Sequence, residues 1–486
     1  MGPVFDHSQL RRFLADPSSW RVLVVGAGKS GRAVLCLLHK LGARVRLTDL
    51  APASEMDKPF AGWIKENGIA WEHGGHKLET FLQAHLIVVS PGVSLEISCL
   101  KKAGEKGIPI IGELGFAYLF LDGLPVIGVT GTNGKTTVTN MLAALFKEAG
   151  RKVFVGGNIG RPLSEYLLEV TDNIRSALRA ELAVLEISSY QLETAGSFRP
   201  DLGILLNISP DHLDRYDSYN DYAETKFSLF ANQHVGDRAL LNLDDPEIRK
   251  RMSGFPGQGE KFYWGNRLQG RQGACLYDEE VVLTFADRSE EYRLPESLQS
   301  SPCRENTMAA VLAARLAGCP PEAITKGLAS FKPSAHRITR VAEIDGVVFY
   351  DDSKATNIGA VQSALAGMDR PVILIAGGRD KGGDYRLLAP LIQEKVKFLF
   401  LIGEAREKMA RALDQVVSIQ MAGDLQEGVY RAVEAAVPGD AVLLSPACAS
   451  FDMYRDYIER GLHFQEIINS IESQAGKPKA PERLTN

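Results

Sequence analysis

The chain has 486 residues, of which 45% are apolar and 24% are charged, and its formal net charge is −5. This composition is that of an ordinary globular protein, and the length exceeds what one hydrophobic core usually serves, so we expect three domains. The slightly acidic balance excludes a global basic field of the kind that nucleic-acid binding uses. The six cysteines form no CxxC pair, and no apolar run approaches the roughly 18 residues of a membrane span. The sequence therefore predicts a cytoplasmic protein without nucleic-acid or membrane partners.

Apolar, β-branched runs alternate with helical stretches from the start of the chain. The first series holds RVLVVGAG near residue 21, RVRLTD near 44 and HLIVVSPG near 85. Continuous runs of this kind are typical of strands buried on both faces of a parallel sheet. The series ends near IPIIGELGF, so we expect a Rossmann-like domain at residues 1–112.

A glycine-rich turn, GAGKSG at residues 26–31, follows the first of these strands and opens a helix, and Asp49 ends the next strand. Such a turn lets the backbone approach a pyrophosphate, and the helix N-terminus attracts its charge. A tight turn without a ligand is the alternative. An NAD-dependent oxidoreductase is one function that this motif would serve.

The stretch VTGTNGKTT, residues 129–137, follows the apolar run LPVIG and also opens a helical pattern. The strict phosphate-loop pattern GxxxxGK[ST] requires glycine where Val129 stands, so this loop is a variant. Backbone N–H groups would still hold phosphate oxygens, with Lys135 reaching the β- and γ-phosphates and Thr136 binding Mg²⁺. The alternative is a glycine-rich turn with an incidental lysine. We favour binding of ATP or GTP.

The next strands, LAVLEIS near residue 182 and LGILLNIS near 202, place Glu186 and His212 after their carboxyl ends. Ligands bind at that edge of open parallel sheets, so the pair indicates an Mg²⁺ site. A helix cap and a hydrogen-bonded loop histidine are the alternatives. Further on, alternation in EVVLTFADRSEEYRL predicts a small antiparallel sheet inserted in a central domain at residues 113–334.

A third series of strands, PVILIAGG near residue 371, KFLFLIG near 397 and AVLLSPA near 441, predicts another α/β domain at residues 335–486. DDSKATN, residues 351–357, gathers polar side chains where a strand ends, and Lys381 lies in a glycine-rich loop. A surface turn would look similar, and Ser450 could be only an N-cap. The composition after about residue 474 predicts disorder.

Six motifs together resemble the Mur ligases, ATP-dependent amino-acid-adding enzymes of peptidoglycan synthesis: TGTNGKTT, GGNIG, LEISSYQLE, NISPDHLDRY, YDDSKATN and LLSPACASFDMYRDYIERG. The resemblance covers nearly the whole chain, and the variant phosphate loop is the one that this family uses. The last two motifs are most similar to the branch that adds D-glutamate to UDP-N-acetylmuramoyl-L-alanine.

The resemblance implies a three-domain α/β fold: an N-terminal Rossmann-like domain, a central ATPase-like parallel sheet and a C-terminal Rossmann-like domain. It implies ATP and Mg²⁺ as cofactors, an acyl-phosphate intermediate, a monomeric enzyme, and a place in cell-wall synthesis and hence in cell shape and division. UDP-N-acetylmuramoyl-L-alanine and D-glutamate would be its small-molecule substrates.

The resemblance also assigns site residues. The UDP substrate would contact Gly28, Lys29, Ser30, Asp49, Ser90, Gly92, Asn158 and His212. ATP would contact Gly131, Thr132, Asn133, Gly134, Lys135, Thr136, Thr137, Asn306, His336, Arg337 and Asp352. D-Glutamate would contact Thr356, Lys381, Ser450, Phe451 and Tyr457. The metal ligands would be Thr136, Glu186, His212 and carbamylated Lys226, and the catalytic residues Lys135, His212 and Lys226.

Lys226 shows how much the resemblance adds. From the sequence alone, a lysine in DYAETKFSLF reads as a solvated helix lysine. A carbamate requires an unprotonated amine, so the resemblance implies that Lys226 is buried, which lowers the pKa of a lysine.

The chain also departs from the family pattern. Pro302 and Cys303 stand where relatives carry a His-Asn pair, Thr339 replaces a frequent glutamate, and Leu50 and Ala51 replace polar uridine contacts, which leaves more of uracil recognition to Asp49.

Three other functions remain open from the sequence. A folylpolyglutamate synthase shares the central and C-terminal scheme but does not need the GAGKSG domain. An NAD-dependent oxidoreductase leaves the phosphate loop unexplained, and a nucleotide-switched interaction protein leaves DDSKATN unexplained.

Overall fold

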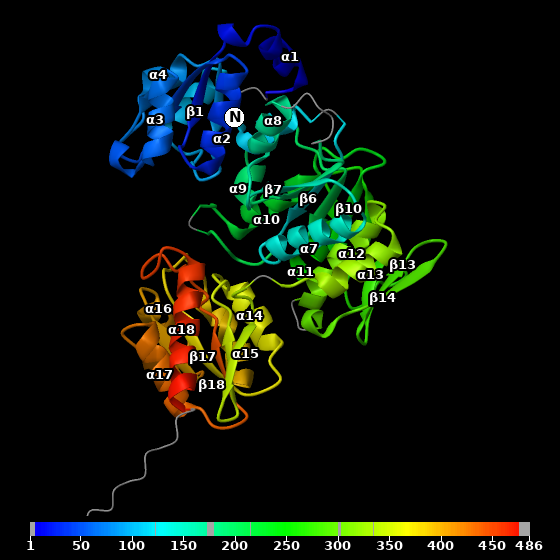
Figure 1. Ribbon diagram of the computed structural model, residues 1–486, viewed down its shortest axis with the longest axis vertical. Coiled ribbons are helices and arrows are strands. Elements are labelled where there is room, and N and C mark those ends of the chain that lie inside the picture. Colours follow the sequence, from blue (N-terminus) through cyan, green and yellow to red (C-terminus); the bar gives the residue numbers. More distant parts are fainter. Residues whose placement is uncertain are drawn as a thin grey trace, which may run out of the picture. The chain divides into compact units, whose positions relative to one another are not determined.

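The computed structural model describes residues 5–121, 123–172, 179–213, 215–299, 303–333 and 335–475. These residues form three β-sheets with helices around them (Figure 1). The packing groups the chain into two compact units. The first unit holds Met1–Asn207, Asn220–Arg293 and Asn306–Phe331, and the second holds Ile208–Tyr219, Leu294–Glu305 and Lys332–Asn486.

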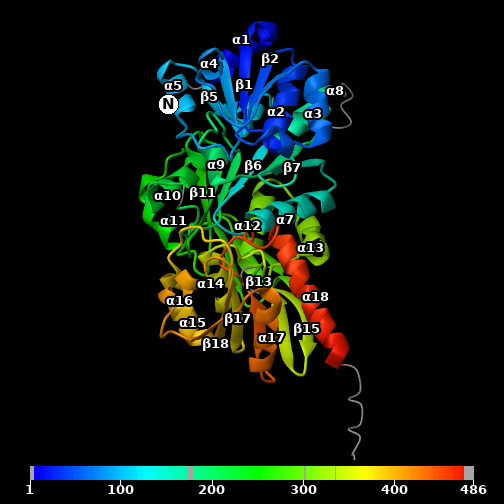
Figure 2. The same cartoon turned by 90° about the vertical axis from the view of Figure 1, so that its left-hand side faces the viewer.

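The first sheet is parallel, with strand order β3-β2-β1-β4-β5. Its strands are β1 (Arg21–Val25), β2 (Arg44–Thr48), β3 (Ala70–Glu72), β4 (Leu86–Val89) and β5 (Ile110–Gly112). Its helices are α1 (His7–Ala15), α2 (Lys29–Lys40), α3 (Lys58–Glu66), α4 (Leu78–Leu82), α5 (Ser98–Glu105) and α6 (Glu113–Tyr118). Figure 2 shows α4 and α5 on one side of β1 and α2 on the other. The strand order reverses between β1 and β4, which is where ligands bind in such sheets.

The second sheet has the order β14-β13-β12-β11-β10-β9-β6-β8-β7. Its strands are β6 (Val126–Thr130), β7 (Val153–Gly157), β8 (Leu182–Glu186), β9 (Leu202–Leu205), β10 (Arg238–Asn242), β11 (Glu260–Trp264), β12 (Gly273–Tyr277), β13 (Glu280–Thr284) and β14 (Ser289–Arg293). The helices are α7 (Lys135–Glu148), α8 (Leu163–Asp172), α9 (Ser189–Leu192), α10 (Tyr219–Phe227), α11 (Pro246–Arg251), α12 (Cys303–Leu316) and α13 (Pro321–Ser330). The predicted antiparallel pairing is present in β12–β14, but these strands extend the parallel sheet instead of forming a separate one.

The third sheet has the order β15-β16-β20-β17-β18-β19, and only β15 pairs antiparallel within the described strands. The strands are β15 (Thr339–Ile344), β16 (Val347–Asp351), β17 (Val372–Gly377), β18 (Val396–Ile402), β19 (Ser418–Met421) and β20 (Ala441–Leu444). The helices are α14 (Ile358–Ala366), α15 (Ala389–Lys395), α16 (Arg406–Ala412), α17 (Leu425–Ala435) and α18 (Tyr457–Ala475).

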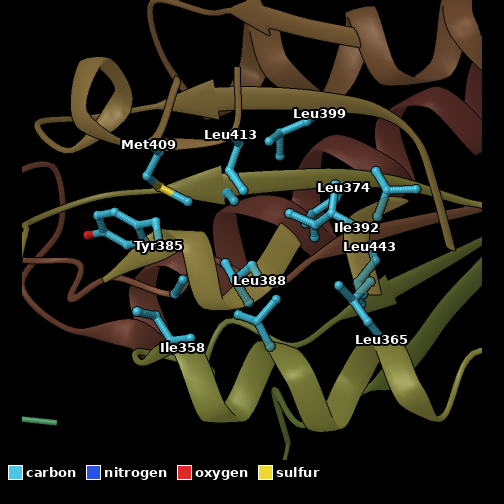
Figure 3. Close-up of a cluster of buried hydrophobic side chains, with 14 of the residues drawn as sticks. Ile358, Leu365, Leu374, Tyr385, Leu388, Ile392, Leu399, Met409, Leu413 and Leu443 are labelled. Carbon is cyan, nitrogen blue, oxygen red and sulfur yellow. The ribbon is translucent and has the colours of Figure 1, made fainter. Parts of the chain in front are cut away.

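Both faces of this third sheet are buried, which explains its continuous apolar runs. Leu374, Leu399 and Leu443 pack against α14, α15 and α16 in one cluster (Figure 3). Ile373 and Phe400, on the opposite face, pack against α17 and α18. Figure 1 shows α17 and α18 on one side of the sheet and α14 and α15 on the other. Neighbouring residues of one strand thus enter two different cores.

Every continuous run that the sequence predicted to be a strand is a strand in the structure. Among the strands that were not predicted are β3, β7 and β19. Each lies at an edge of its sheet and is only partly buried, so it lacks the continuous apolar run on which the prediction relied. Each sheet lies within one of the three predicted domain ranges, although the domain bounds themselves stay a prediction. Most of the tail predicted to be disordered lies outside the described residues.

Candidate active site

The phosphate loop connects β6 to α7, and its backbone shape depends on glycine. Gly134 is the N-cap of α7 and has φ 86°, a left-handed conformation that favours glycine. A Cβ atom at Gly134 would lie 2.2 Å from Oδ1 of Asn306, so the loop also packs closely on α12. The N–H of Asn133 donates to Oδ1 of Asn207 at 2.8 Å. The loop therefore presents a helix N-terminus in a braced conformation, which suits phosphate binding.

The two loop residues predicted to act on phosphate and metal, Lys135 and Thr136, lie at the start of α7. Lys135 Nζ donates to the carbonyl oxygens of Gly131 and Thr132, both at 2.8 Å, so the ammonium group lies over the loop. Thr136 Oγ1 donates to Oε2 of Glu186 at 2.8 Å. The side chain of the next residue, Thr137, is buried. Thr137 would therefore contact a phosphate through its backbone N–H.

Glu186 joins the phosphate loop to a neighbouring loop. It ends β8 and is buried, and while its Oε2 accepts from Thr136, its Oε1 accepts from Asn158 Nδ2 at 2.8 Å. Asn158 follows β7, the strand next to β8. A chain of hydrogen bonds thus runs from Thr136 through Glu186 to Asn158.

Lys226 lies in α10 and is 1% exposed, so the burial implied by the family resemblance is present. Its Nζ donates to the carbonyl oxygen of Gly131 at 2.9 Å and lies 4.6 Å from the centre of the Tyr222 ring. Tyr222 in turn shares a hydrogen bond of 3.0 Å with Thr132. The lysine is therefore part of the phosphate-loop environment.

A cavity of about 600 Å³ lies in the first unit, at the carboxyl ends of β1 and β4. It is lined by all but one of the residues predicted to hold the UDP substrate: Gly28, Lys29, Ser30, Asp49, Ser90, Gly92 and Asn158. Lys29 Nζ donates to the carbonyl oxygen of Gly160, which lines the same cavity. The exception, His212, follows β9 in the segment that belongs to the second unit.

Asp49 holds the glycine-rich turn as well as lining this cavity. Its two carboxylate oxygens accept the backbone N–H groups of Ala27 and Ala51. The turn itself is tight, because a Cβ atom at Gly31 would lie 1.8 Å from the carbonyl oxygen of Gly26. The cavity wall is therefore set by backbone packing, and the diphosphate contact expected at this turn stays a prediction.

Gln191 and His76 are among the cavity residues that were not predicted from the sequence. Gln191 is 2% exposed, its Oε1 is engaged by Ser188, and its buried Nε2 has no hydrogen-bond partner among the described residues. His76 shares a hydrogen bond of 2.8 Å with Thr48, and burial lowers the pKa of its imidazole. Gln191 lies in the LEISSYQLE motif, from which the sequence analysis took only Glu186 as a ligand.

In the second unit, β16 ends in a buried group of polar side chains. Nδ1 of His336 lies 2.6 Å from Oδ2 of Asp351. Ser445 Oγ donates to Oδ2 of Asp352 at 2.7 Å. Burial raises the pKa of the Asp352 carboxyl to about 7, although the Ser445 hydrogen bond and the Arg337 charge lower it. Asp352 and Arg337, both assigned to ATP, are thus electrostatically coupled here.

Asp352→Asn is expected to stabilise the protein at neutral pH but not in acid. The pKa of Asp352 is about 7 in the folded chain and near 3.8 in the unfolded chain. The protonated carboxyl therefore contributes fully to the free energy of unfolding below pH 3.8, and this contribution is lost as the pH rises through 7. The melting temperature of the variant minus that of the wild type should therefore grow between pH 4 and 7 and then level off. A melting-temperature difference that is constant over this range would show that the pKa of Asp352 is not raised in the folded protein.

The residues predicted for D-glutamate come from three loops of the second unit. Lys381 Nζ lies 3.6 Å from Oδ1 of Asp211. In the DDSKATN turn, the backbone N–H of Thr356 donates to the carbonyl oxygen of Lys354 at 2.9 Å. Ser450 is buried after β20, whereas the side chain of Phe451 is exposed. Tyr457 begins α18.

A buried arginine that the sequence did not indicate joins two of these loops. Arg460 is fully buried in α18, and it donates to the carbonyl oxygens of Ser353 and Cys448. Ser353 Oγ accepts from Arg460 Nε at 2.9 Å and donates to the carbonyl oxygen of Tyr457 at 2.8 Å. The loops after β16 and β20 are therefore held together by α18.

The described residues place limits on metal and membrane binding. They contain no group of three or more His, Cys, Asp and Glu side chains that could hold a metal ion by itself. No described helix combines the length and apolar character needed to cross a membrane. The departure at Pro302 lies outside the described residues, and Cys303 begins α12.

Comparison with protein families gives three matches along the chain. A model described as Mur ligase MurD-like, N-terminal domain, matches residues 20–112. The Mur ligase middle domain matches residues 129–314, and the Mur ligase glutamate ligase domain matches residues 336–448.

Curated relatives match over most of both chains. The UDP-N-acetylmuramoylalanine–D-glutamate ligase of Acidobacterium capsulatum is 43% identical over 453 residues, which cover 92% of this chain and 96% of the relative. The ligase of the same name from Desulfosudis oleivorans is 42% identical and covers 93% of this chain and 96% of the relative.

Solved structures share the fold at lower identity. A pseudomurein peptide ligase type C from Methanothermus fervidus has a TM-score of 0.59 and 19% identity, covering 93% of this chain and 100% of that one. MurF ligase from Thermotoga maritima, solved in complex with ADP, has a TM-score of 0.58 and 19% identity, covering 88% and 95%.

Proposed function

We propose that this chain, which belongs to the Mur ligase family, is an ATP-dependent ligase that adds D-glutamate to UDP-N-acetylmuramoyl-L-alanine. The reaction forms an amide between the amino group of D-glutamate and the carboxylate of the L-alanyl group. It is a step of peptidoglycan precursor synthesis, and through the cell wall it supports cell shape and division.

One observation carries this proposal furthest: the chain of hydrogen bonds from Thr136 through Glu186 to Asn158. Asn158 lines the 600 Å³ cavity, whereas Thr136 belongs to the phosphate loop. A nucleotide-linked substrate in the cavity would therefore extend toward a nucleotide at the loop. This arrangement suits transfer of a phosphoryl group between two bound molecules.

The cavity also separates this proposal from the two enzyme alternatives. A folylpolyglutamate synthase has no need of the first sheet, whose glycine-rich turn forms one wall of the cavity. An oxidoreductase that bound NAD there would leave unused the buried Glu186 and Lys226 around the phosphate loop. Fold alone does not decide function, so these site features carry the distinction.

Magnesium fits the oxygen-rich side of the phosphate loop. The hydroxyl of Thr136 and the carboxylate of Glu186 are hard oxygen donors that already lie within hydrogen-bond distance. Mg²⁺ usually takes one or two carboxylates and completes its shell with substrate phosphates and water. Bound there with ATP, Mg²⁺ would offset the negative charge of the phosphates during transfer.

In the proposed reaction, a carboxylate oxygen of the substrate attacks the γ-phosphorus of ATP. The bond from phosphorus to the β,γ-bridging oxygen breaks, so ADP leaves and an acyl phosphate forms. The neutral amine of D-glutamate then attacks the acyl carbon, and phosphate leaves with the former carboxylate oxygen. Lys135 neutralises charge on the transferring phosphoryl group, which would otherwise repel the incoming carboxylate.

Lys226 is proposed to carry a carbamate. Its neutral amine adds to CO₂, forming an N–C bond with loss of a proton, and the product is an anion. The side chain is buried beside the phosphate loop, and its amine contacts the Gly131 carbonyl and the Tyr222 ring. With the carbamate, Lys226 would be the third side chain near the proposed Mg²⁺ site that offers oxygen ligands, beside Thr136 and Glu186.

The remaining assignments concern the second unit and the cell. D-Glutamate binds among Thr356, Lys381, Ser450, Phe451 and Tyr457, whose cation and hydroxyl groups suit two carboxylates. His336, Arg337 and Asp352 contribute to the ATP site, as does Asn306 of α12, and His212 binds substrate and metal. The enzyme acts as a cytoplasmic monomer, in the compartment that holds UDP-linked sugars and ATP.

A substrate-omission assay tests the function. Steady-state ADP formation should require both UDP-N-acetylmuramoyl-L-alanine and D-glutamate, because without the amino acid the reaction stops at the acyl phosphate. L-Glutamate should not replace the D-enantiomer, because the pocket aims only one enantiomer's amine. ATP turnover that needs neither substrate, or that follows L-glutamate or a folate equally well, would overturn the proposal.

A further inference from the structure

Asp211, in the segment Ile208–Tyr219 of the second unit, points its carboxylate at two loops of the third sheet. Its Oδ1 lies 3.6 Å from Nζ of Lys381, in the loop after β17. Its Oδ2 accepts a hydrogen bond of 3.1 Å from Nδ2 of Asn357, which follows β16. The side chain of Asp211 is only 8% exposed. The carboxylate is therefore nearly desolvated, and the Lys381 ammonium group and the Asn357 amide lie against it, as does His212, whose Nε2 is 3.6 Å from Oδ2.

The orientation of Asn357 is fixed by a second role. Asn357 is the N-cap of α14, and its Oδ1 accepts the N–H of Ala360 at 2.9 Å. Because the oxygen is used by the helix, the amide nitrogen must point the other way, toward Asp211. Asn357 is thus a rigid N–H donor opposite a flexible ammonium group.

One cation and one fixed N–H donor make a site for a carboxylate. The two donors come from loops that also carry Thr356 and Lys381, which the proposed function assigns to D-glutamate. D-Glutamate offers two carboxylates, and the side chain of Asp211 has the same chemical group. The same polar groups would therefore receive either the protein's own carboxylate or that of the amino acid.

We propose that Lys381 Nζ and Asn357 Nδ2 form the subsite for one carboxylate of D-glutamate, and that Asp211 fills this subsite until the amino acid arrives. The inference rests on the proposed function, since it names a ligand of the same amino-acid pocket. Asn357 is then a specificity residue that selects an amino acid with a side-chain carboxylate. The carboxylate of Asp211 occupies the subsite in the absence of D-glutamate and is displaced when D-glutamate binds.

Displacement of Asp211 has a consequence for the neighbouring His212. Oδ1 of Asp211 also accepts the backbone N–H of His212 at 3.0 Å, and His212 has a left-handed φ of 54°. Such a conformation is uncommon for a residue other than glycine and must be held by its surroundings. Binding of the amino acid would release this hold, so D-glutamate binding and the backbone position of His212 are coupled.

Two isosteric variants test the subsite through the KM for D-glutamate, measured with ATP, Mg²⁺ and UDP-N-acetylmuramoyl-L-alanine at saturation. Asp211→Asn removes the competing charge and should lower this KM roughly threefold to fivefold. Asn357→Asp keeps a helix cap of equal strength but replaces the donor with a carboxylate, so it should raise the KM about tenfold or more. The KM for ATP should stay within about twofold in both variants, which a general loss of structure would not give.

Asp440→Asn is the matched control. Asp440 is 3% exposed and pairs with Lys397 at 2.8 Å in the same unit, so the variant also removes a buried charge beside a lysine. Its KM for D-glutamate should equal that of the wild type. A raised KM in Asp211→Asn, or an unchanged KM in Asn357→Asp, would overturn the subsite while wild-type use of D-glutamate upholds the function. A wild type that does not use D-glutamate would overturn the function itself.

Discussion

Lys135→Ala should reduce kcat by about a thousandfold or more, the largest effect expected for any single residue of the site. The Lys135 ammonium lies over the phosphate loop, within 2.8 Å of two of its carbonyl oxygens. Two anions, the γ-phosphate and a carboxylate, must approach each other in the first step. Loss of the cation leaves their repulsion uncompensated at the moment of transfer.

The measurement is the steady-state rate of ADP formation with ATP and both substrates saturating, which gives kcat. Lys147→Ala is the control, because Lys147 lies at the exposed last turn of the same helix α7. It should keep wild-type kcat, and both variants should unfold at similar temperatures. If Lys135→Ala kept kcat within about tenfold of the wild type, the phosphate loop would not be the site of phosphoryl transfer.

Lys226→Met should lower kcat by about ten- to hundredfold, because it removes an anionic group beside the metal ligands. Methionine fills a similar buried volume, so the loss should not come from a cavity. The wild type in bicarbonate should carry the added mass of one CO₂, and brief acid treatment should remove both this mass and the activity. The intact-protein mass and kcat are measured on the same samples.

Lys250→Met, at an exposed position of α11, is the matched control and should change neither the CO₂ adduct nor kcat. A Lys226→Met enzyme with wild-type activity would show that no carbamate acts in the reaction. An adduct that persists in Lys226→Met would place the carbamate on another lysine.

The strands that a sequence can predict are those with two buried faces. In the third sheet, Ile373 and Leu374 enter opposite cores, and this double burial produces the apolar run that indicated β17. Strand β19 has the pattern SIQM and is mostly exposed at a sheet edge, so nothing in its composition separated it from a loop. The antiparallel strands β13 and β14 were recognised by their alternation, but alternation does not show which sheet a strand joins.

The candidate site divides in the same way. The glycines of the phosphate loop could be recognised, since a left-handed residue such as Gly134 at a strand-to-helix turn leaves a local signal. The role of Lys226 could not, because its burial depends on packing between α10 and the loop after β6, which are far apart in sequence. Arg460 was missed for the same reason: its partners Ser353 and Cys448 lie in two other loops.

Oxygen-18 in the carboxylate of UDP-N-acetylmuramoyl-L-alanine tests the acyl-phosphate reaction most directly. The carboxylate oxygen that attacks the γ-phosphorus stays with phosphate when the amine of D-glutamate displaces it. One labelled oxygen should therefore appear in each phosphate released, as measured by mass spectrometry of the phosphate alongside the amide product. Unlabelled phosphate formed together with the amide product would contradict phosphorylation of the substrate carboxylate.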